Sequence, residues 1–201
     1  MTADSPSDIV IHTALEDGSK VCIRTPTKDD NALMRTGLGQ MSPRSLYLRF
    51  FSGARTPPDW VIDRLLEVDG HNHLAWGAIN SEAEGKPAIG IVHAFRSPDQ
   101  PECAEFSVAV IDSYHGLGLG KLLTATILLD ARREGLTGFT ANTLAENTEA
   151  IDFTKSLGGK LTSRDGAVNV YAFDIDDALA ALKAECDPPG IAEVFRVLGS
   201  D

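Results

Sequence analysis

The chain of 201 residues has few cysteines and no long apolar run. Its three cysteines, Cys22, Cys103 and Cys186, are odd in number and far apart, and no CxxC pair is present. This pattern argues against a disulfide framework and against a zinc site, so we expect no bound metal. No apolar segment approaches the ~18 residues that a membrane-spanning helix needs, which argues against a membrane protein.

Basic residues are also scarce. Lysine and arginine number 18 against 29 aspartates and glutamates, a formal net charge of −11. Nucleic acids and anionic membranes both require a basic face, so neither is an expected partner. The N-terminus, MTADSPSDIV, lacks the basic and apolar regions of a signal peptide, and we therefore expect a cytoplasmic protein.

What is present is enough apolar sequence for one folded domain, since 43% of the residues are hydrophobic. We expect a flexible tail over residues 1–8, a single domain over 9–186, and a short C-terminal helical extension over 187–201. Apolar periodicity and turn residues predict two strands, helices, three strands, a helix, a strand, a helix, a hairpin and a helix. Because three strands precede the clearest crossover helix, at 121–134, an α/β fold with a mixed sheet flanked by helices fits better than a doubly wound sheet.

The glycine-rich segment 114–121 is the most informative, and it lies between a predicted strand and a predicted helix. Glycines at every second position let backbone N–H groups converge, and the start of the helix adds further donors and the positive end of its dipole. The segment therefore predicts a phosphate cradle. It is not a P-loop, because His115 and Leu122 stand where glycine and Ser or Thr are needed. Lys121 breaks the Rossmann fingerprint. A purely structural turn remains the alternative.

The segment HGLGLG resembles the pyrophosphate loop, Q/R-x-x-G-x-G/A, of the GNAT superfamily of acetyl-CoA-dependent N-acetyltransferases. Downstream, NTEAIDFTKSLGG resembles the family's N-x-x-A-x-x-x-Y-x-x-x-G-F segment. Asn147, Ala150 and Gly158 match it, whereas Thr154 and Gly159 stand where Tyr and Phe are usual. The resemblance covers residues 20–175 and implies a GNAT-like fold, with a mostly antiparallel twisted sheet flanked by helices.

Two further segments, SPRSLYLRFF and AEFSVAVIDSYHGLGLG, are most similar to bacterial Pat-type protein-lysine acetyltransferases. The resemblance implies acetyl-CoA as cofactor, with the backbone of Val108 and Val110 paired to its pantetheine arm as an added strand would be. It also implies a set of contacts from the loop and the following helices: His115, Gly116, Leu117, Gly118, Leu119, Gly120, Lys121, Asn147 and Thr154. His115 replaces the usual Gln or Arg, and a solvent-facing role is as compatible with the sequence as a phosphate contact.

Glu105 is the candidate catalytic base. A lysine ammonium has no lone pair at pH 7, so acetyl transfer needs a group that removes its proton. Glu105 lies in an otherwise apolar strand segment, CAEFSVAV, where an unpaired carboxylate is costly without a partner or a function. Alternation places it on one face with Ser107, and its position before the loop matches the catalytic glutamate of many GNAT enzymes. A surface glutamate paired with an arginine is the alternative.

Other side chains are assigned less directly. His93 is expected in the core, with a second relay group as the alternative. The aromatic residues at 47, 50, 51 and 60 have a spacing that is more typical of core than of a substrate cage. Thr154 replaces a tyrosine that protonates the leaving thiolate in many relatives, so water or the incoming ammonium has to supply that proton.

The leading hypothesis is an N-acetyltransferase that transfers an acetyl group from acetyl-CoA to a primary amine, with a protein lysine as one candidate acceptor. A small-molecule amine or antibiotic acetyltransferase is the alternative with the same chemistry. A catalytically impaired acyl-CoA-binding sensor is the alternative from a different class. Sheet-edge dimers are common in families that resemble this one, so a homodimer is a further expectation.

Overall fold

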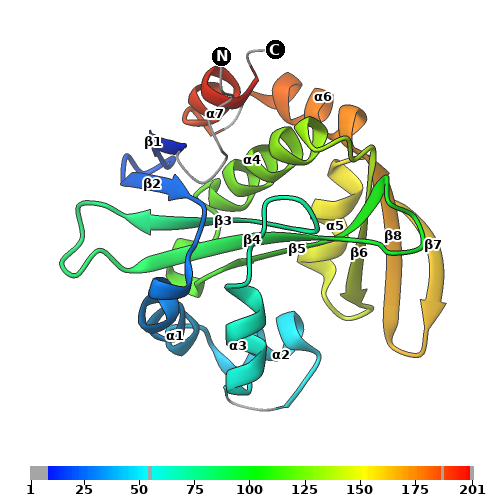
Figure 1. Ribbon diagram of the computed structural model, residues 1–201, viewed down its shortest axis with the longest axis horizontal. Helices are drawn as coiled ribbons and strands as arrows, with labels where there is room; N and C mark the ends of the chain where they lie inside the picture. Colours follow the sequence, from blue (N-terminus) through cyan, green and yellow to red (C-terminus); the bar gives the residue numbers. More distant parts are fainter. Residues whose placement is uncertain (1–8, 54–55, 187, 200–201) are drawn as a thin grey trace.

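A mixed sheet, with strand order β1-β2-β3-β4-β5-β6-β8-β7, runs through the part of the chain described by the computed structural model, residues 9–53, 56–186 and 188–199 (Figure 1). The expected tail at residues 1–8 lies outside the described residues. All neighbouring strands are antiparallel except β5 and β6. The expectation of a mixed, mostly antiparallel sheet is therefore confirmed.

The first five strands form an antiparallel meander, interrupted by helices between the second and the third. Their bounds are β1 Val10–Ala14, β2 Lys20–Arg24, β3 His73–Asn80, β4 Ala88–Arg96 and β5 Cys103–Val110. The turn between β1 and β2 contains Gly18 at φ 87°, a left-handed conformation that an Asp-Gly turn supplies at little steric cost.

The second half of the sheet begins with the single parallel connection. Helix α4, Leu119–Arg133, carries the chain from β5 to β6, Gly138–Leu144. Helix α5, Thr148–Ser156, then leads to the antiparallel hairpin of β7, Lys160–Asp165, and β8, Val168–Asp174. The chain closes with α6, Ile175–Glu185, and α7, Ile191–Leu198.

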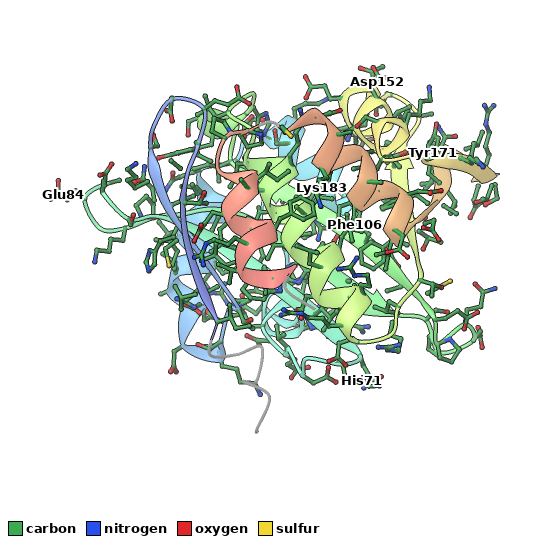
Figure 2. All side chains as sticks on the ribbon, turned by 90° about the horizontal axis from the view of Figure 1, so that it is seen from above. His71, Glu84, Phe106, Asp152, Tyr171 and Lys183 are labelled. Carbon is green, nitrogen blue, oxygen red and sulfur yellow. The ribbon has the colours of Figure 1, made fainter. Side chains whose placement is uncertain are left out.

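One face of the sheet is covered by α4, α6 and α7. Figure 2, which looks down onto this side, shows α4 between α7 and α6. The main hydrophobic core lies beneath these helices, where Phe106, Phe139 and Phe173 pack with ring centroids 5.6–5.9 Å apart. Helix α7 adds Ile191, Val194 and Leu198 to the same core. Burial of such side chains contributes roughly 1.5–3 kcal/mol each, so this layer is a main source of the stability that holds the helices on the sheet.

The opposite face carries a short 3-10 helix, η2 Lys28–Asp30, followed by α1 Asn31–Gly39, α2 Pro43–Phe50 and α3 Asp59–Leu65. Ser42 caps α2, because its side chain accepts a hydrogen bond from the Ser45 amide at 3.1 Å, and Pro43 occupies the first helical position. These helices form a smaller core that packs against Ile91 and Phe95 of β4.

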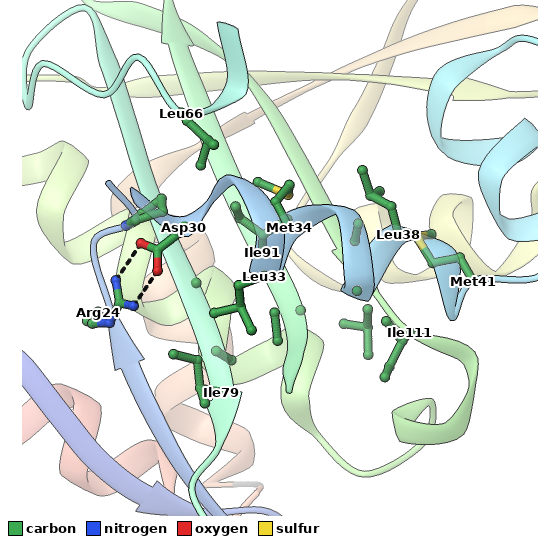
Figure 3. Close-up of a pocket in the computed structure, with 18 residues that line it drawn as sticks. Arg24, Asp30, Leu33, Met34, Leu38, Met41, Leu66, Ile79, Ile91 and Ile111 are labelled. Atoms are coloured by element: carbon green, nitrogen blue, oxygen red, sulfur yellow. Dashed lines mark hydrogen bonds and ion pairs between the residues drawn. The ribbon is translucent and has the colours of Figure 1, made fainter. Parts of the chain in front are cut away.

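A small apolar cavity of about 60 Å³ lies between α1 and the sheet (Figure 3). Leu33, Met34 and Leu38 line it from the helix, and Arg24 and Asp30 form an ion pair at 2.6 Å at its edge. The cavity is lined mainly by apolar side chains, and its charged residues are paired with each other.

None of the helices within the described residues is long and apolar enough to cross a membrane.

Candidate active site

A cleft of about 420 Å³ opens where β5 and β6 separate. The two strands pair with each other from Cys103 and Gly138 up to Phe106 and Ala141. Beyond these residues β5 continues to Val110 and β6 to Leu144, but the two strands no longer pair with each other. The cleft is lined by the rest of both strands together with side chains of α2 and α5. Its floor is therefore a strand edge whose backbone groups have lost their neighbouring strand.

The backbone groups of Val108 and Val110 face this cleft. Ile111 donates its N–H to the carbonyl of Ile89 on the β4 side at 3.0 Å. Because successive residues of an antiparallel strand point their N–H and C=O groups to opposite sides, Val108 and Val110 direct theirs toward β6. The expected strand-like pairing of a ligand arm with these two residues is sterically open.

His115 lines the cleft and is exposed, as the solvent-facing interpretation expects, and its ring also makes a hydrogen bond that the sequence did not suggest. Its Nε2 atom is 2.9 Å from the carbonyl oxygen of Val110, and since a carbonyl can only accept, Nε2 donates. The ring therefore ties the start of the glycine loop to the end of β5. This hydrogen bond uses one lone pair of the Val110 carbonyl oxygen and leaves the N–H group of Val110 available.

The glycine loop contains two residues in the left-handed region, Gly116 at φ 73° and Gly118 at φ 80°. Helix α4 begins at Leu119, two residues earlier than the sequence predicted, and Gly118 is its N-cap. The first intrahelical bond runs from Leu122 N–H to Gly118 C=O at 3.1 Å. The N–H groups of Leu119, Gly120 and Lys121 therefore precede the helix ladder and suit an anion.

The lysine at the end of the glycine loop has a partner within the protein. Lys121 Nζ forms an ion pair at 2.7 Å with Glu185 of α6, so its charge is partly balanced there. The loop itself is held from outside, because Glu16 N–H donates to Leu117 C=O at 3.3 Å and the ring of Pro188 packs against Gly118.

Helix α5 supplies the second motif. The Asn147 side chain caps it by accepting the Ala150 N–H at 3.2 Å, which leaves the Nδ2 atom for any contact with a ligand. Thr154 is buried and lines the cleft, but its Oγ1 donates to the carbonyl of Ala150 at 2.7 Å. Its hydroxyl proton is therefore committed to the helix. Gly159 is required by the backbone of the same helix, because a Cβ there would lie 2.5 Å from the carbonyl oxygen of residue 154.

Glu105 lies at the junction of this cleft and a second one lined by Arg64, Glu67 and His73. The predicted alternation is confirmed, since Phe106 packs in the main core and Glu105 is exposed. Because Glu105 is exposed, the energetic cost expected of an unpaired carboxylate in this apolar segment does not apply. Exposure at the meeting point of two clefts leaves the carboxylate accessible to an incoming amine.

Arg49 of α2 lies near Glu105 and was not identified from the sequence. Its Nη2 donates to Ser107 Oγ at 2.8 Å, and its guanidinium lies over the ring of Phe50 at 5.0 Å. Burial lowers the pKa of Arg49 to about 10, while the charge of Glu105 opposes that shift. The arginine stands between apolar residues in the sequence, and no local signal marks it as part of a site.

His93 is fully buried, as expected of a core residue, but it belongs to a hydrogen-bonded pair. His73 Nδ1 is 2.8 Å from the carbonyl of Glu67, and His73 Nε2 is 3.0 Å from His93 Nδ1. The carbonyl fixes His73 as the donor at Nδ1, so His93 donates to His73 Nε2 when both rings are neutral. Burial, followed by the charge of Arg49, keeps the pKa of His93 well below 6.5.

Two buried polar atoms in the described part of the chain lack a hydrogen-bond partner: His93 Nε2 and Thr143 Oγ1. Thr143 lines the cleft from β6, and His93 lies opposite Ser107, whose side chain also lines it.

Among the aromatic residues assigned to the core, Phe51 and Trp60 are 40% and 67% exposed, so that assignment is wrong for both. Phe50 and Phe51 line the cleft.

No group of three or more metal-ligating side chains occurs within the described residues. The site thus consists of a strand edge, an anion cradle and an accessible carboxylate, an arrangement suited to transferring a group from an anionic carrier to a nucleophile.

Residues 42–158 match the model of the Acetyltransferase (GNAT) family, and the chain belongs to this family. The family uses acetyl-CoA as its acetyl donor.

Three individual similarities refine this placement. Acetyltransferase PA5475 of Pseudomonas aeruginosa is 27% identical over 145 residues, which cover 72% of this chain and 77% of that protein. Acetyltransferase Pat of Mycolicibacterium smegmatis is 28% identical over 136 residues, 68% of this chain but 40% of that protein. The crystal structure of the GNAT domain of S. lividans PAT superposes with a TM-score of 0.75 at 24% identity, covering 82% of this chain and 96% of that domain.

Proposed function

We propose that this chain binds acetyl-CoA along the edge of β5 and acetylates a primary amine, with a protein lysine as acceptor and Glu105 as the general base. The observation that carries the proposal is the cleft itself, which leads from the exposed carboxylate of Glu105 along a free strand edge to His115 at the start of the glycine loop. The lysine acceptor is what the resemblance of two segments to Pat-type protein-lysine acetyltransferases implies, and the chain is 28% identical to an acetyltransferase named Pat.

The residues present fit such a ligand. The backbone of Val108 and Val110 matches the two amides of a pantetheine arm, and the amides of Leu119, Gly120 and Lys121 match a pyrophosphate. Thr143, whose buried hydroxyl has no hydrogen-bond partner within the described residues, lines the same cleft. Asn147 Nδ2 is the remaining donor at the start of α5.

The chemistry follows from this arrangement. Bound acetyl-CoA supplies an activated thioester, whose C–S bond breaks as the amine nitrogen forms the new C–N bond. Glu105 removes one proton from the acceptor ammonium, directly or through a water, so that the nitrogen lone pair can react. Thr154 donates its hydroxyl proton to Ala150 and is a weak acid, so the second ammonium proton or water neutralises the departing thiolate.

The test combines calorimetry with acetyl-CoA and a thiol-release assay over a panel of amines. Glu105→Gln is expected to bind acetyl-CoA like the wild type but to lower turnover about 10²-fold or more at pH 7. Glu102→Gln, an exposed glutamate just before β5, is the matched control and is expected to leave turnover unchanged.

Each alternative has its own signature in these assays. Unchanged turnover in Glu105→Gln removes this residue from the mechanism. Binding without thiol release on any amine indicates a sensor, and the absence of binding overturns the proposal. Mass spectrometry of a protein extract after incubation with the enzyme and acetyl-CoA is expected to reveal acetylated lysines, whereas acetylation of small amines alone contradicts the lysine acceptor.

A further inference from the structure

The positively charged guanidinium of Arg49 lies in the cleft without a carboxylate partner among the described residues. It is half-buried in the last turn of α2 and lines the cleft wall. Its contacts within the described residues are the neutral hydroxyl of Ser107 and the ring of Phe50, and no ion pair with a carboxylate of these residues is formed. Since a guanidinium has five N–H donors, most of its hydrogen-bonding capacity is unused by these contacts.

Such an arrangement is costly unless an anion completes it. Even partial desolvation of a cation without a counter-charge is unfavourable, and arginines withdrawn from water are usually paired. Glu105 is the acidic group that influences Arg49, yet it lies beyond ion-pair distance and is exposed to the cleft. His93 behind Ser107 is neutral and supplies no charge.

The phosphates of the cofactor do not account for this cation. Arg49 contacts Ser107, whereas the glycine loop follows Val110, and three residues of extended strand separate these points by about 10 Å. The cleft therefore holds a cation and an anion, Arg49 and Glu105, on its acceptor side and a separate backbone cradle at its other end.

We propose that Arg49 binds a carboxylate of the acceptor while Glu105 receives its amine, so that the preferred acceptors carry both groups on one molecule. The inference rests on the proposed function and narrows its substrate class. The planar guanidinium can bind a carboxylate through two parallel hydrogen bonds, which a lysine in its place could not do. On a peptide acceptor, the carboxylate is a chain terminus or an acidic side chain beside the target amine.

The test compares acceptors that differ only at the carboxylate. Unbranched ω-amino acids of two to six carbons are each assayed against the corresponding carboxamide, by thiol release with acetyl-CoA and by calorimetric binding to the enzyme saturated with CoA. Peptides with a free or amidated C-terminus, with and without an acidic neighbour, distinguish the two peptide sources. Arg49→Met removes the guanidinium, and Arg49→Lys keeps the charge without the planar fork. The affinity for acetyl-CoA reports whether each variant is folded.

We expect the wild type to favour the carboxylate over the carboxamide at least about tenfold in kcat/KM and in affinity at the best chain length. Arg49→Met is expected to abolish that ratio, and Arg49→Lys to retain part of it, with acetyl-CoA affinity unchanged in both. A wild-type ratio near one, or a ratio that survives in Arg49→Met, overturns the inference while leaving amine acetylation intact. Acceptor panels in which no amine is acetylated, with or without a carboxylate, refute the proposed function instead.

Discussion

His73 of β3 and His93 of β4 share a hydrogen bond of 3.0 Å between Nε2 of the first ring and Nδ1 of the second. Burial is the largest cause that lowers the pKa of each ring, and both stay neutral near pH 7. Phe95 stacks on His73 with ring centroids 4.0 Å apart. The pair is therefore a neutral polar element in an otherwise apolar layer.

This pair predicts a loss of stability below pH 6.5. The unfolded chain protonates both histidines near that pH and the folded chain does not, so the unfolded state binds more protons. The histidines therefore leave the free energy of unfolding undiminished above pH 6.5. Below that pH it falls by up to about 1.4 kcal/mol per pH unit for each histidine. Denaturant titrations between pH 5 and 7.5 measure this slope.

The contribution of the pair is separated by substitution. His93→Gln keeps an amide donor for His73 and is expected to reduce the slope by about half. His12→Gln, at an exposed position of β1, serves as the control and should leave the slope as in the wild type. An identical slope in His93→Gln would show that other groups cause the acid sensitivity.

Asp130 predicts the opposite pH dependence. It is buried in α4 and accepts a hydrogen bond from Trp76 Nε1 at 2.8 Å. Burial raises its pKa, so the folded state holds the proton more tightly than the unfolded chain and loses stability as the pH rises above the usual carboxyl range. Asp130→Asn keeps an acceptor for Trp76, and it should increase the free energy of unfolding at pH 7 by on the order of 1 kcal/mol relative to its effect at pH 4.

Trp76→Phe is the complementary variant for this prediction. It removes the donor and leaves the buried carboxylate without that hydrogen bond, which is expected to cost about 1–3 kcal/mol. Unfolding curves of Asp130→Asn that show a larger loss at pH 7 than at pH 4 would contradict the assigned sign.

The two glycines that flank the start of α4 are predicted to respond differently to alanine. Gly118 has φ 80°, and a Cβ there would lie 2.6 Å from the side chain of Pro188, so Gly118→Ala is expected to cost about 1–3 kcal/mol. A Cβ on Gly120 meets open space within the first helical turn, and Gly120→Ala is expected to gain up to about 1 kcal/mol. Equal changes in the free energy of unfolding would refute the distinction.

Thr143→Val tests the buried hydroxyl on β6. The side chains have the same shape, and within the described residues the hydroxyl has no partner. Removing it should therefore raise the free energy of unfolding of the ligand-free protein by about 1 kcal/mol. Thr126→Val is the matched control, because the Thr126 hydroxyl donates to Leu122 C=O at 2.8 Å, and it should show no comparable gain. A loss of stability in Thr143→Val would indicate a hydrogen bond that the structure does not contain.

The sequence by itself determined the order of the helices and strands, the place of the glycine loop and the face of β5 that carries Glu105. These features depend on neighbours within a few residues: alternation in a strand, glycine at a left-handed turn, and caps such as Asn147. The start of α4 lies at Leu119, two residues before the predicted start, because Gly118 serves as the cap while Gly120 continues as helix.

Only the tertiary structure decided which side chains meet. The cleft exists because β5 and β6 no longer pair with each other after Phe106 and Ala141, and α2 and α5 supply its other walls. Arg49 reaches Ser107 across 58 positions of the chain, and His73 reaches His93 across 20. Exposure is decided in the same way, because the burial of a side chain is a sum over all the elements packed around it. For that reason Glu105 is exposed although its local sequence is apolar, Trp60 is exposed although it is aromatic, and Lys121 forms an ion pair with Glu185.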